Sequence, residues 1–134
     1  MSILLLSSCN KKDYSNELLS YENLKINFIN QFDFFIFVPS DYCIDCFLEI
    51  RKTIESKQQT EQVIFIISGR NSKEITNFSY NFSGLNYIEE NNLNHNRPIL
   101  PVIYYKSGNV YRKREITKES DLTEILNLRI KAVK

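Results

Sequence analysis

Two cysteines separated by two residues, Cys43 and Cys46, are the side chains in this chain best suited to do chemistry. They follow the apolar run 34–38 and stand just before a helical pattern that begins at Phe47. Free backbone N–H groups and the positive end of the helix dipole stabilise a cysteine thiolate at the start of a helix. The second cysteine, one turn further along, can then attack a mixed disulfide formed at the first. We therefore predict a dithiol that exchanges with disulfides, with Cys43 and Cys46 as its catalytic residues.

A metal site and a purely structural disulfide are the main alternatives for the same pair. Tetrahedral zinc needs four ligands, and beyond Cys9 only His95 could add a cysteine or histidine. His95 lies in a polar, asparagine-rich stretch, where a solvated side chain is a simpler interpretation than a Cys–His nucleophilic pair. We therefore expect no metal and no cofactor, while a structural or vestigial disulfide stays open.

Length and charge balance restrict the possibilities further. The 134 residues are enough for one domain whose core needs no cross-link. Lysine and arginine total 17 against 16 aspartate and glutamate residues, so no excess charge draws the chain to nucleic acid. We expect no nucleic-acid partner.

Cys9 ends a short pattern at the amino terminus that resembles a lipobox. In bacterial lipoproteins a branched apolar residue and two small residues precede the cysteine that receives the lipid, and Leu6, Ser7 and Ser8 stand in those places. Only eight residues precede Cys9 and none of them is basic, so residues 1–8 are interpreted as a truncated signal segment.

The lipobox resemblance implies that Cys9 is lipidated and that the protein is anchored to a membrane of the cell envelope, facing the periplasm or the exterior. Disulfides form and persist in that environment. No run of about 20 apolar residues offers a membrane-spanning helix, so the lipid would be the anchor. The competing interpretation is a frayed apolar terminus with an incidental cysteine.

The rest of the chain has the pattern of an α/β domain. Residues 13–30 are polar with scattered apolar side chains, and they are expected to form a tether and a first amphipathic helix. Aromatic and β-branched residues at 32–38 and 63–67 predict two strands buried on both faces. The stretch 47–58 between them carries one apolar stripe and is predicted to be helical. A helix joining two such strands implies that the strands pair in parallel.

Local signals after residue 70 continue this order. Asn71 followed by Glu74 resembles a capping box and predicts a short helix. The stretch 77–96 could be an edge strand or a loop, and the pattern does not decide between them. The remaining predicted elements are a strand at 101–106, its hairpin partner at 110–114 and a closing helix at 121–131.

This order of elements, with the C-x-x-C pair between the first strand and its helix, resembles the thioredoxin superfamily, most closely the membrane-tethered extracytoplasmic thiol–disulfide oxidoreductases of bacteria. The resemblance covers residues 32–131. It implies an α/β, three-layer fold for residues 31–134, with a central mixed sheet flanked by helices. It also implies that Cys43 is the nucleophile, Cys46 the resolving cysteine and Pro101 the cis-proline beside the disulfide.

The same resemblance names substrate-binding residues and partners. Pro101 and Leu100, whose backbone would pair with an extended substrate, would form a groove together with Tyr42. Pro98 is the rival for the place of the cis-proline. The implied partners are protein thiols or disulfides and an upstream electron-donating redox protein.

Three positions depart from the family pattern. Tyr42 stands where the family usually has Trp, and Ile44 and Asp45 replace the common Gly-Pro pair. The charge of Asp45 is expected to raise the pKa of Cys43 and so to favour a reducing protein of low potential. The buried carboxylate that relays protons in many relatives has no counterpart, because Phe37 and its neighbours are apolar.

A non-catalytic thioredoxin-like binding lipoprotein is the alternative function. It would keep the disulfide for structure and offer a partner the surface around Tyr104, Tyr105 and Tyr111. The basic run 112–114 on the predicted hairpin is interpreted as protection of an edge strand, and an anion-binding patch is the other possibility.

Overall fold

The computed structural model describes residues 12–20, 31–69, 71–90 and 99–133, without the side chains of 119 and 128–133. Its centre is a five-stranded mixed sheet with strand order β3-β2-β1-β4-β5. The strands are β1 (Phe34–Pro39), β2 (Val63–Ser68), β3 (Tyr87–Glu90), β4 (Val102–Ser107) and β5 (Val110–Glu115). The helices are α2 (Ser15–Leu19), α4 (Ile44–Ser56), α5 (Ser72–Ser79) and α6 (Glu119–Val133), with 3-10 turns η1 (Thr60–Gln62) and η2 (Tyr80–Phe82).

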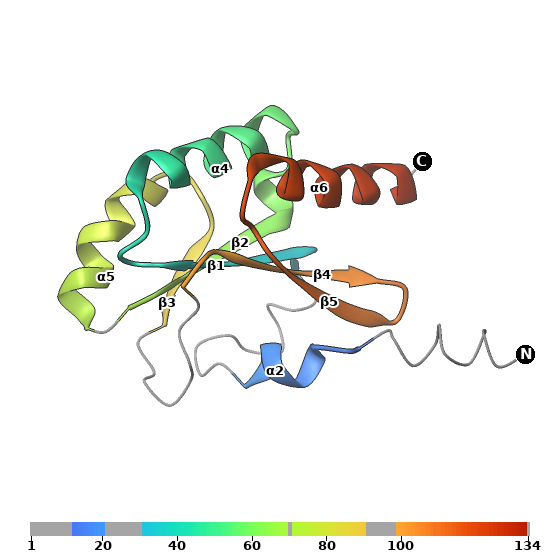
Figure 1. Cartoon of the computed structure of the whole chain (residues 1–134), viewed down its shortest axis with the longest axis horizontal. Coiled ribbons are helices and arrows are strands. Elements are labelled where there is room, and N and C mark those ends of the chain that lie inside the picture. Colours follow the sequence, from blue (N-terminus) through green and yellow to red (C-terminus); the bar gives the residue numbers. More distant parts are fainter. Residues whose placement is uncertain (1–11, 21–30, 70, 91–98, 134) are drawn as a thin grey trace, which may run out of the picture.

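Helices cover both faces of this sheet (Figure 1). Side chains of α4, α5 and α6 pack on one face, whereas the short helix α2 lies against the other. The predicted α/β class, with a mixed sheet flanked by helices, is therefore confirmed.

β1 is the central strand, and its two neighbours run in opposite directions. β2 is parallel to it, with Phe34 opposite Val63, and β4 is antiparallel, with Phe37 opposite Val102. Every residue of β1 and β2 is buried, which is why both strands are continuously apolar in the sequence. The prediction of two parallel strands buried on both faces is confirmed. β1 begins two residues later than the predicted 32–38 and ends one residue later, at Pro39.

Successive residues of β1 point to opposite faces and contribute to two separate cores. Phe34, Ile36 and Val38 belong to the larger core, under α4, α5 and α6. Phe35 and Phe37 belong to the smaller core, on the side of α2.

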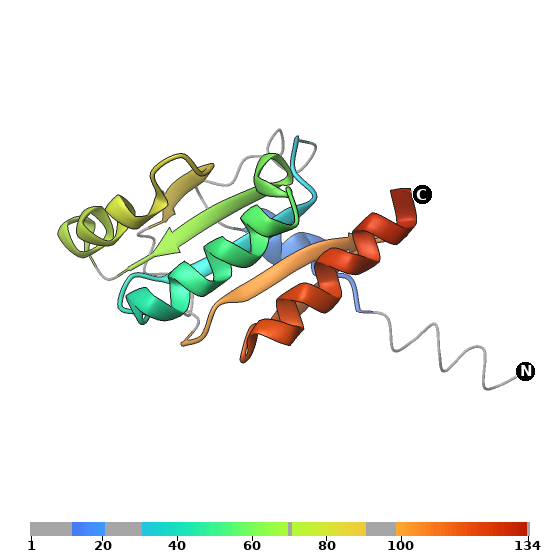
Figure 2. The same ribbon diagram turned by 90° about the horizontal axis from the view of Figure 1, so that it is seen from above.

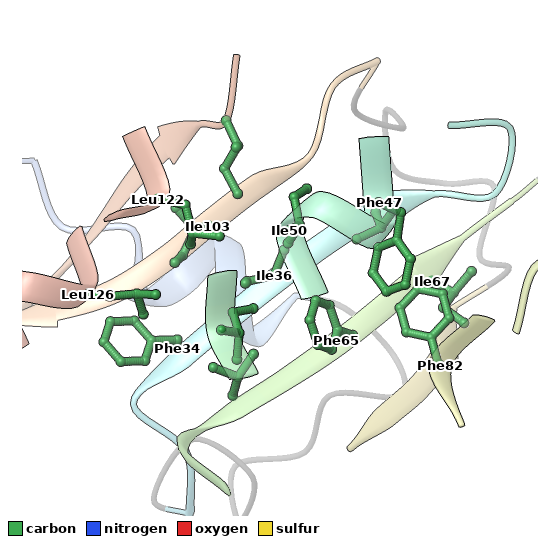
Figure 3. Close-up of a cluster of buried hydrophobic side chains, with 14 of the residues drawn as sticks. Phe34, Ile36, Phe47, Ile50, Phe65, Ile67, Phe82, Ile103, Leu122 and Leu126 are labelled. Carbon is green, nitrogen blue, oxygen red and sulfur yellow. The ribbon is translucent and has the colours of Figure 1, made fainter. Parts of the chain in front are cut away.

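The larger core holds an aromatic cluster around Phe47, the first buried residue of α4. The centroid of its ring lies 4.2 Å from that of Phe82, 5.5 Å from that of Phe65 and 5.9 Å from that of Phe78. Figure 3 shows the Phe47 ring facing Phe65 and Phe82. Because Phe47 directly follows Cys46, these contacts hold the start of α4 against the sheet.

Residues 12–20 lie against the second face and cover the edge strand β5. Leu18 is fully buried there. The backbone N–H of Tyr14 donates to the carbonyl oxygen of Tyr111 at 2.9 Å, and the Asp13 carboxylate accepts the backbone N–H of Tyr111 at 3.0 Å. This part of the predicted tether is therefore docked on the domain.

Several residues singled out in the sequence lie outside the described ranges. They are Cys9 with the preceding segment 1–8, His95 and Pro98. Within the described ranges, every helix is too short or too polar to cross a bilayer.

Strand β3 resolves the choice that the sequence left open between residues 77 and 96. It pairs in parallel with β2 at the edge of the sheet, with Ile88 opposite Ile66. Of its four residues only Glu90 is fully buried, so its sequence lacks the apolar pattern of an interior strand. The predicted order of elements therefore gains one strand between α5 and the hairpin.

Candidate active site

The turn between β1 and α4 places Cys43 at the amino end of the helix. The backbone N–H of Tyr42 donates to the carbonyl oxygen of Pro39 at 3.0 Å, which turns the chain after the strand. Cys43 is the N-cap residue, with φ −56° and ψ 122°, and its Sγ accepts the backbone N–H of Cys46 at 3.2 Å. Because this side chain caps the helix, α4 begins at Ile44, earlier than the sequence pattern predicted.

Both cysteines lie at the surface of the protein. Cys43 and Cys46 are free thiols, and both residues are exposed. A cysteine that is open to other molecules and sits at a helix amino end meets the usual conditions for a reactive thiol.

Hydrogen bonds from Cys46 lower the pKa of Cys43. The Cys46 thiol donates to the Cys43 sulfur, the Cys46 backbone N–H also donates to it, and the backbone N–H of Asp45 adds a smaller effect in the same direction. Partial desolvation and the negative charge of Asp45 act to raise the pKa but are outweighed. The prediction that Asp45 leaves Cys43 with a raised pKa is therefore wrong, because nearby donors outweigh one solvated carboxylate.

The pKa values of Cys46 and Tyr42, the neighbours of Cys43, are raised. The hydrogen bond to Cys43 is the largest cause that raises the pKa of Cys46, followed by desolvation and by the charges of Cys43 and Asp45. Burial, and then the charges of Cys46 and Cys43, raise the pKa of Tyr42. The site therefore favours one thiolate, at Cys43, beside two groups that keep their protons.

This difference predicts the pH dependence of alkylation. The rate of Cys43 modification by iodoacetamide should reach half its maximum at a pH below the ~8.5 of a free cysteine. Since the pKa is lowered, the reactive thiolate persists as the pH falls toward neutrality and is lost only below the shifted pKa. Mass spectrometry after timed labelling would measure the two cysteines separately.

The matched control for that measurement is Cys46→Ala, which removes the S–H donor but keeps the backbone N–H. Its midpoint should move upward, part of the way to that of free cysteine. A wild-type midpoint at or above the value of free cysteine would contradict the assignment of Cys43 as the stabilised thiolate.

A pocket of about 240 Å³ opens beside Cys46, between α4 and the segment that joins β5 to α6. Its lining consists of Tyr42, Cys46, Glu49, Ile50, Thr53, Ile116, Thr117, Lys118 and Leu122. Of the three substrate-binding residues expected from the sequence, Tyr42 lines this pocket, whereas Leu100 and Pro101 do not.

Leu100 and Pro101 nevertheless directly precede β4, whose first residue pairs with β1 near the strand end that leads to the dithiol. Val102 stands opposite Phe37 near the end of β1, so the two residues before it fall next to the turn that follows β1. No peptide bond within the described residues is cis, so the expectation of a cis peptide bond at Pro101 is wrong. The trans form is favoured by about 0.5–1 kcal/mol for an ordinary X–Pro bond, and here the carbonyl of Pro101 accepts the Ile116 N–H at 2.8 Å, which continues the hairpin.

Sequence reasoning missed the residues of this pocket that come from other elements. Thr117 and Lys118 lie about 70 positions from the cysteines in the chain, and only the pairing of β4 with β1 and β5 brings their segment to this end of the sheet. Thr53 and Glu49 could have been found, because positions three and four residues apart share a helix face with Cys46.

The structure does not favour either of the two other binding surfaces considered above, the tyrosine surface and the basic run 112–114. Tyr104 and Tyr111 are buried, and Tyr105 packs against the larger core, so they do not form an exposed binding surface. In the basic run, Lys113 pairs with Glu17 at 2.9 Å.

Arg114, the other paired residue of that run, contacts Asp121 at 2.7 Å and Glu124 at 3.4 Å. Two of the three basic side chains are thus engaged within the molecule, and β5 is the edge strand that they accompany. This arrangement agrees with the protective role more than with an anion-binding patch.

Within the described part of the chain, no group of three or more histidine, cysteine, aspartate or glutamate side chains is arranged to hold a metal ion. Comparisons with protein-family models, with curated proteins and with solved structures find no match to this chain.

Proposed function

We propose that this protein carries out thiol–disulfide exchange on protein substrates through Cys43 and Cys46, as a thioredoxin-like oxidoreductase. One observation carries the proposal: the exposed residue Cys43 caps α4, and its sulfur accepts hydrogen bonds from the thiol and the backbone N–H of Cys46, which lower its pKa. An inert buried cysteine would have neither the access nor the stabilised thiolate.

The exchange would take place in two steps. The Cys43 thiolate attacks one sulfur of a substrate disulfide, so a Cys43–substrate disulfide forms and the other substrate sulfur leaves as a thiolate. Cys46 then loses its proton to solvent and attacks the Cys43 sulfur, which releases the second substrate thiolate. The substrate gains two electrons and the enzyme ends as a Cys43–Cys46 disulfide.

A second dithiol must restore the reduced enzyme, which is the role of the proposed electron-donating redox protein. In the opposite direction the same steps would oxidise a substrate dithiol. A reducing protein of low potential is expected if the pKa of Cys43 is raised, whereas here that pKa is lowered. A stabilised thiolate favours the reduced form of the pair and so moves its potential toward the oxidising side.

The proposal has two further parts, the fold and the location of the protein. The thioredoxin-like fold is supported by the order of β1, α4, β2, α5, the β4–β5 hairpin and α6, with β3 as an added strand. The lipid anchor at Cys9 and the location in the cell envelope are supported by the lipobox pattern, and the cysteine pair suits a compartment where disulfides persist.

The test is catalysis of peptide disulfide reduction by dithiothreitol. The wild-type protein should accelerate the reaction many-fold at catalytic concentration, and Cys43→Ser should reduce the rate to that without protein. Lys52→Ala, an exposed change on the same helix outside the pocket, is the matched control and should behave as wild type. A wild-type rate equal to the uncatalysed rate would contradict the proposal.

A further inference from the structure

We propose that the pocket beside Cys46 is a specificity pocket, which takes an apolar side chain of the substrate next to the cysteine under attack. This inference depends on the proposed function, because it assigns the substrate class of the same dithiol. The occupant is an aliphatic or aromatic side chain, one or two residues from the substrate cysteine.

The floor of the pocket is apolar and comes from three separate segments. Ile50 on α4 is 6% exposed, Ile116 after β5 is 3% exposed and Leu122 on α6 is 1% exposed. Figures 1 and 2 both show α4 and α6 side by side over the sheet. The lining of the pocket includes residues of both helices. An apolar side chain that enters a pocket with such a floor leaves water, which favours binding.

The opening of the pocket lies beside the dithiol that would carry out the exchange. Cys46 and Tyr42 form part of its lining, and Cys46 is one turn from Cys43 at the start of α4. A substrate attached to Cys43 continues away from the sulfur as an extended chain at about 3.3–3.6 Å per residue. The side chain one or two residues from its cysteine therefore falls within reach of the pocket.

The wall opposite α4 is held in place by the carboxylate of Asp121, which is buried. One of its oxygens accepts the Thr117 hydroxyl at 2.8 Å, the Thr117 N–H at 3.0 Å and the Lys118 N–H at 3.2 Å. Its other oxygen accepts from Arg114 at 2.7 Å. These contacts, with the Thr117 hydroxyl as the largest cause, lower the pKa of Asp121 to about 2. The carboxylate thus stays ionised at neutral pH, and a wall ordered before binding costs less to order upon binding.

Charges at the mouth do not favour an ionic occupant. Glu49 and Lys118 line the pocket with opposite signs, and both are exposed. Shape and apolar area, rather than net charge, would therefore select the side chain.

The test uses two short disulfide-linked peptides, identical except for Leu or Gly next to the cysteine. Wild-type protein should reduce the Leu peptide about tenfold faster than the Gly peptide, within the range for one apolar side chain in a pocket. Thr53→Leu, which fills the pocket from α4, should bring the ratio close to one. Lys52→Leu places the same side chain on the same helix outside the pocket, and its ratio should stay at the wild-type value.

A second measurement on the wild-type protein needs no variant and no exchange. Methyl NMR signals of Ile50, Ile116 and Leu122 should shift when the Leu peptide is added with its cysteine replaced by serine, and not when the Gly version is added. Exchange with both peptides at equal rates and unshifted methyls would overturn the pocket assignment and leave the proposed function standing. Shifted methyls without any exchange would support the pocket and contradict the proposed function.

Discussion

Cys46→Ser should leave the protein covalently linked to its substrates through Cys43. Cys43 keeps the backbone N–H of residue 46 as a donor, so its thiolate can still attack, but no second sulfur follows to release the substrate. Mixed disulfides that are undetectable in wild type should accumulate to a large fraction of the variant protein. Non-reducing electrophoresis of the variant after incubation with a peptide disulfide, followed by mass spectrometry of the linked peptide, would measure this.

The control is Cys43→Ser, which keeps the other cysteine. Cys46 lacks the helix-cap position and its pKa is raised, so this variant should form little mixed disulfide. If both variants were linked to the peptide equally, the assignment of nucleophile and resolving cysteine would be wrong. If neither were linked, the pair would not be an exchange site.

Phe47→Ala should cause the largest loss of stability among single changes near the site. The side chain is fully buried, and its ring meets those of Phe65, Phe78 and Phe82. Removing a buried phenylalanine costs about 3–5 kcal/mol, because the transfer free energy is lost and a cavity remains. That is a large part of the roughly 5–15 kcal/mol that holds a domain folded. Urea unfolding followed by circular dichroism would measure the change in the free energy of unfolding.

Leu48→Ala is the matched control for this prediction. Leu48 is the next residue on α4 and is 43% exposed, so its replacement should change the free energy of unfolding by only about 0.5 kcal/mol. Equal losses in the two variants would mean that the aromatic cluster does not hold the start of α4.

The reactivity of the dithiol and the packing of the aromatic cluster are linked because Cys46 and Phe47 are adjacent in the chain. Cys46 provides the donor to Cys43, and Phe47 fixes the same turn of helix to the core. The reactivity of the thiolate therefore depends on the packing of the residue that follows it, and a partly unfolded α4 would lose both.

The sequence alone determined what depends on neighbouring residues. The apolar run and the spacing of the cysteines predict a buried strand followed by a helix that begins at the C-x-x-C pair. In the structure β1 ends at Pro39, and α4 begins directly after Cys43. The cap at Asn71 is equally local, and its side chain accepts the Glu74 N–H at 2.8 Å. Such features form between groups a few positions apart, so a short segment of the sequence is enough to predict them.

The tertiary structure decided what depends on distant partners. β3 forms at the edge of the sheet by pairing with β2. The peptide bond before Pro101 is trans, and the carbonyl oxygen of Pro101 accepts a hydrogen bond from the N–H of Ile116. The pocket beside Cys46 exists because the sheet order brings the segment before α6 against α4. These features depend on contacts between segments that are far apart in the sequence. Composition and periodicity do not show which of those segments come into contact.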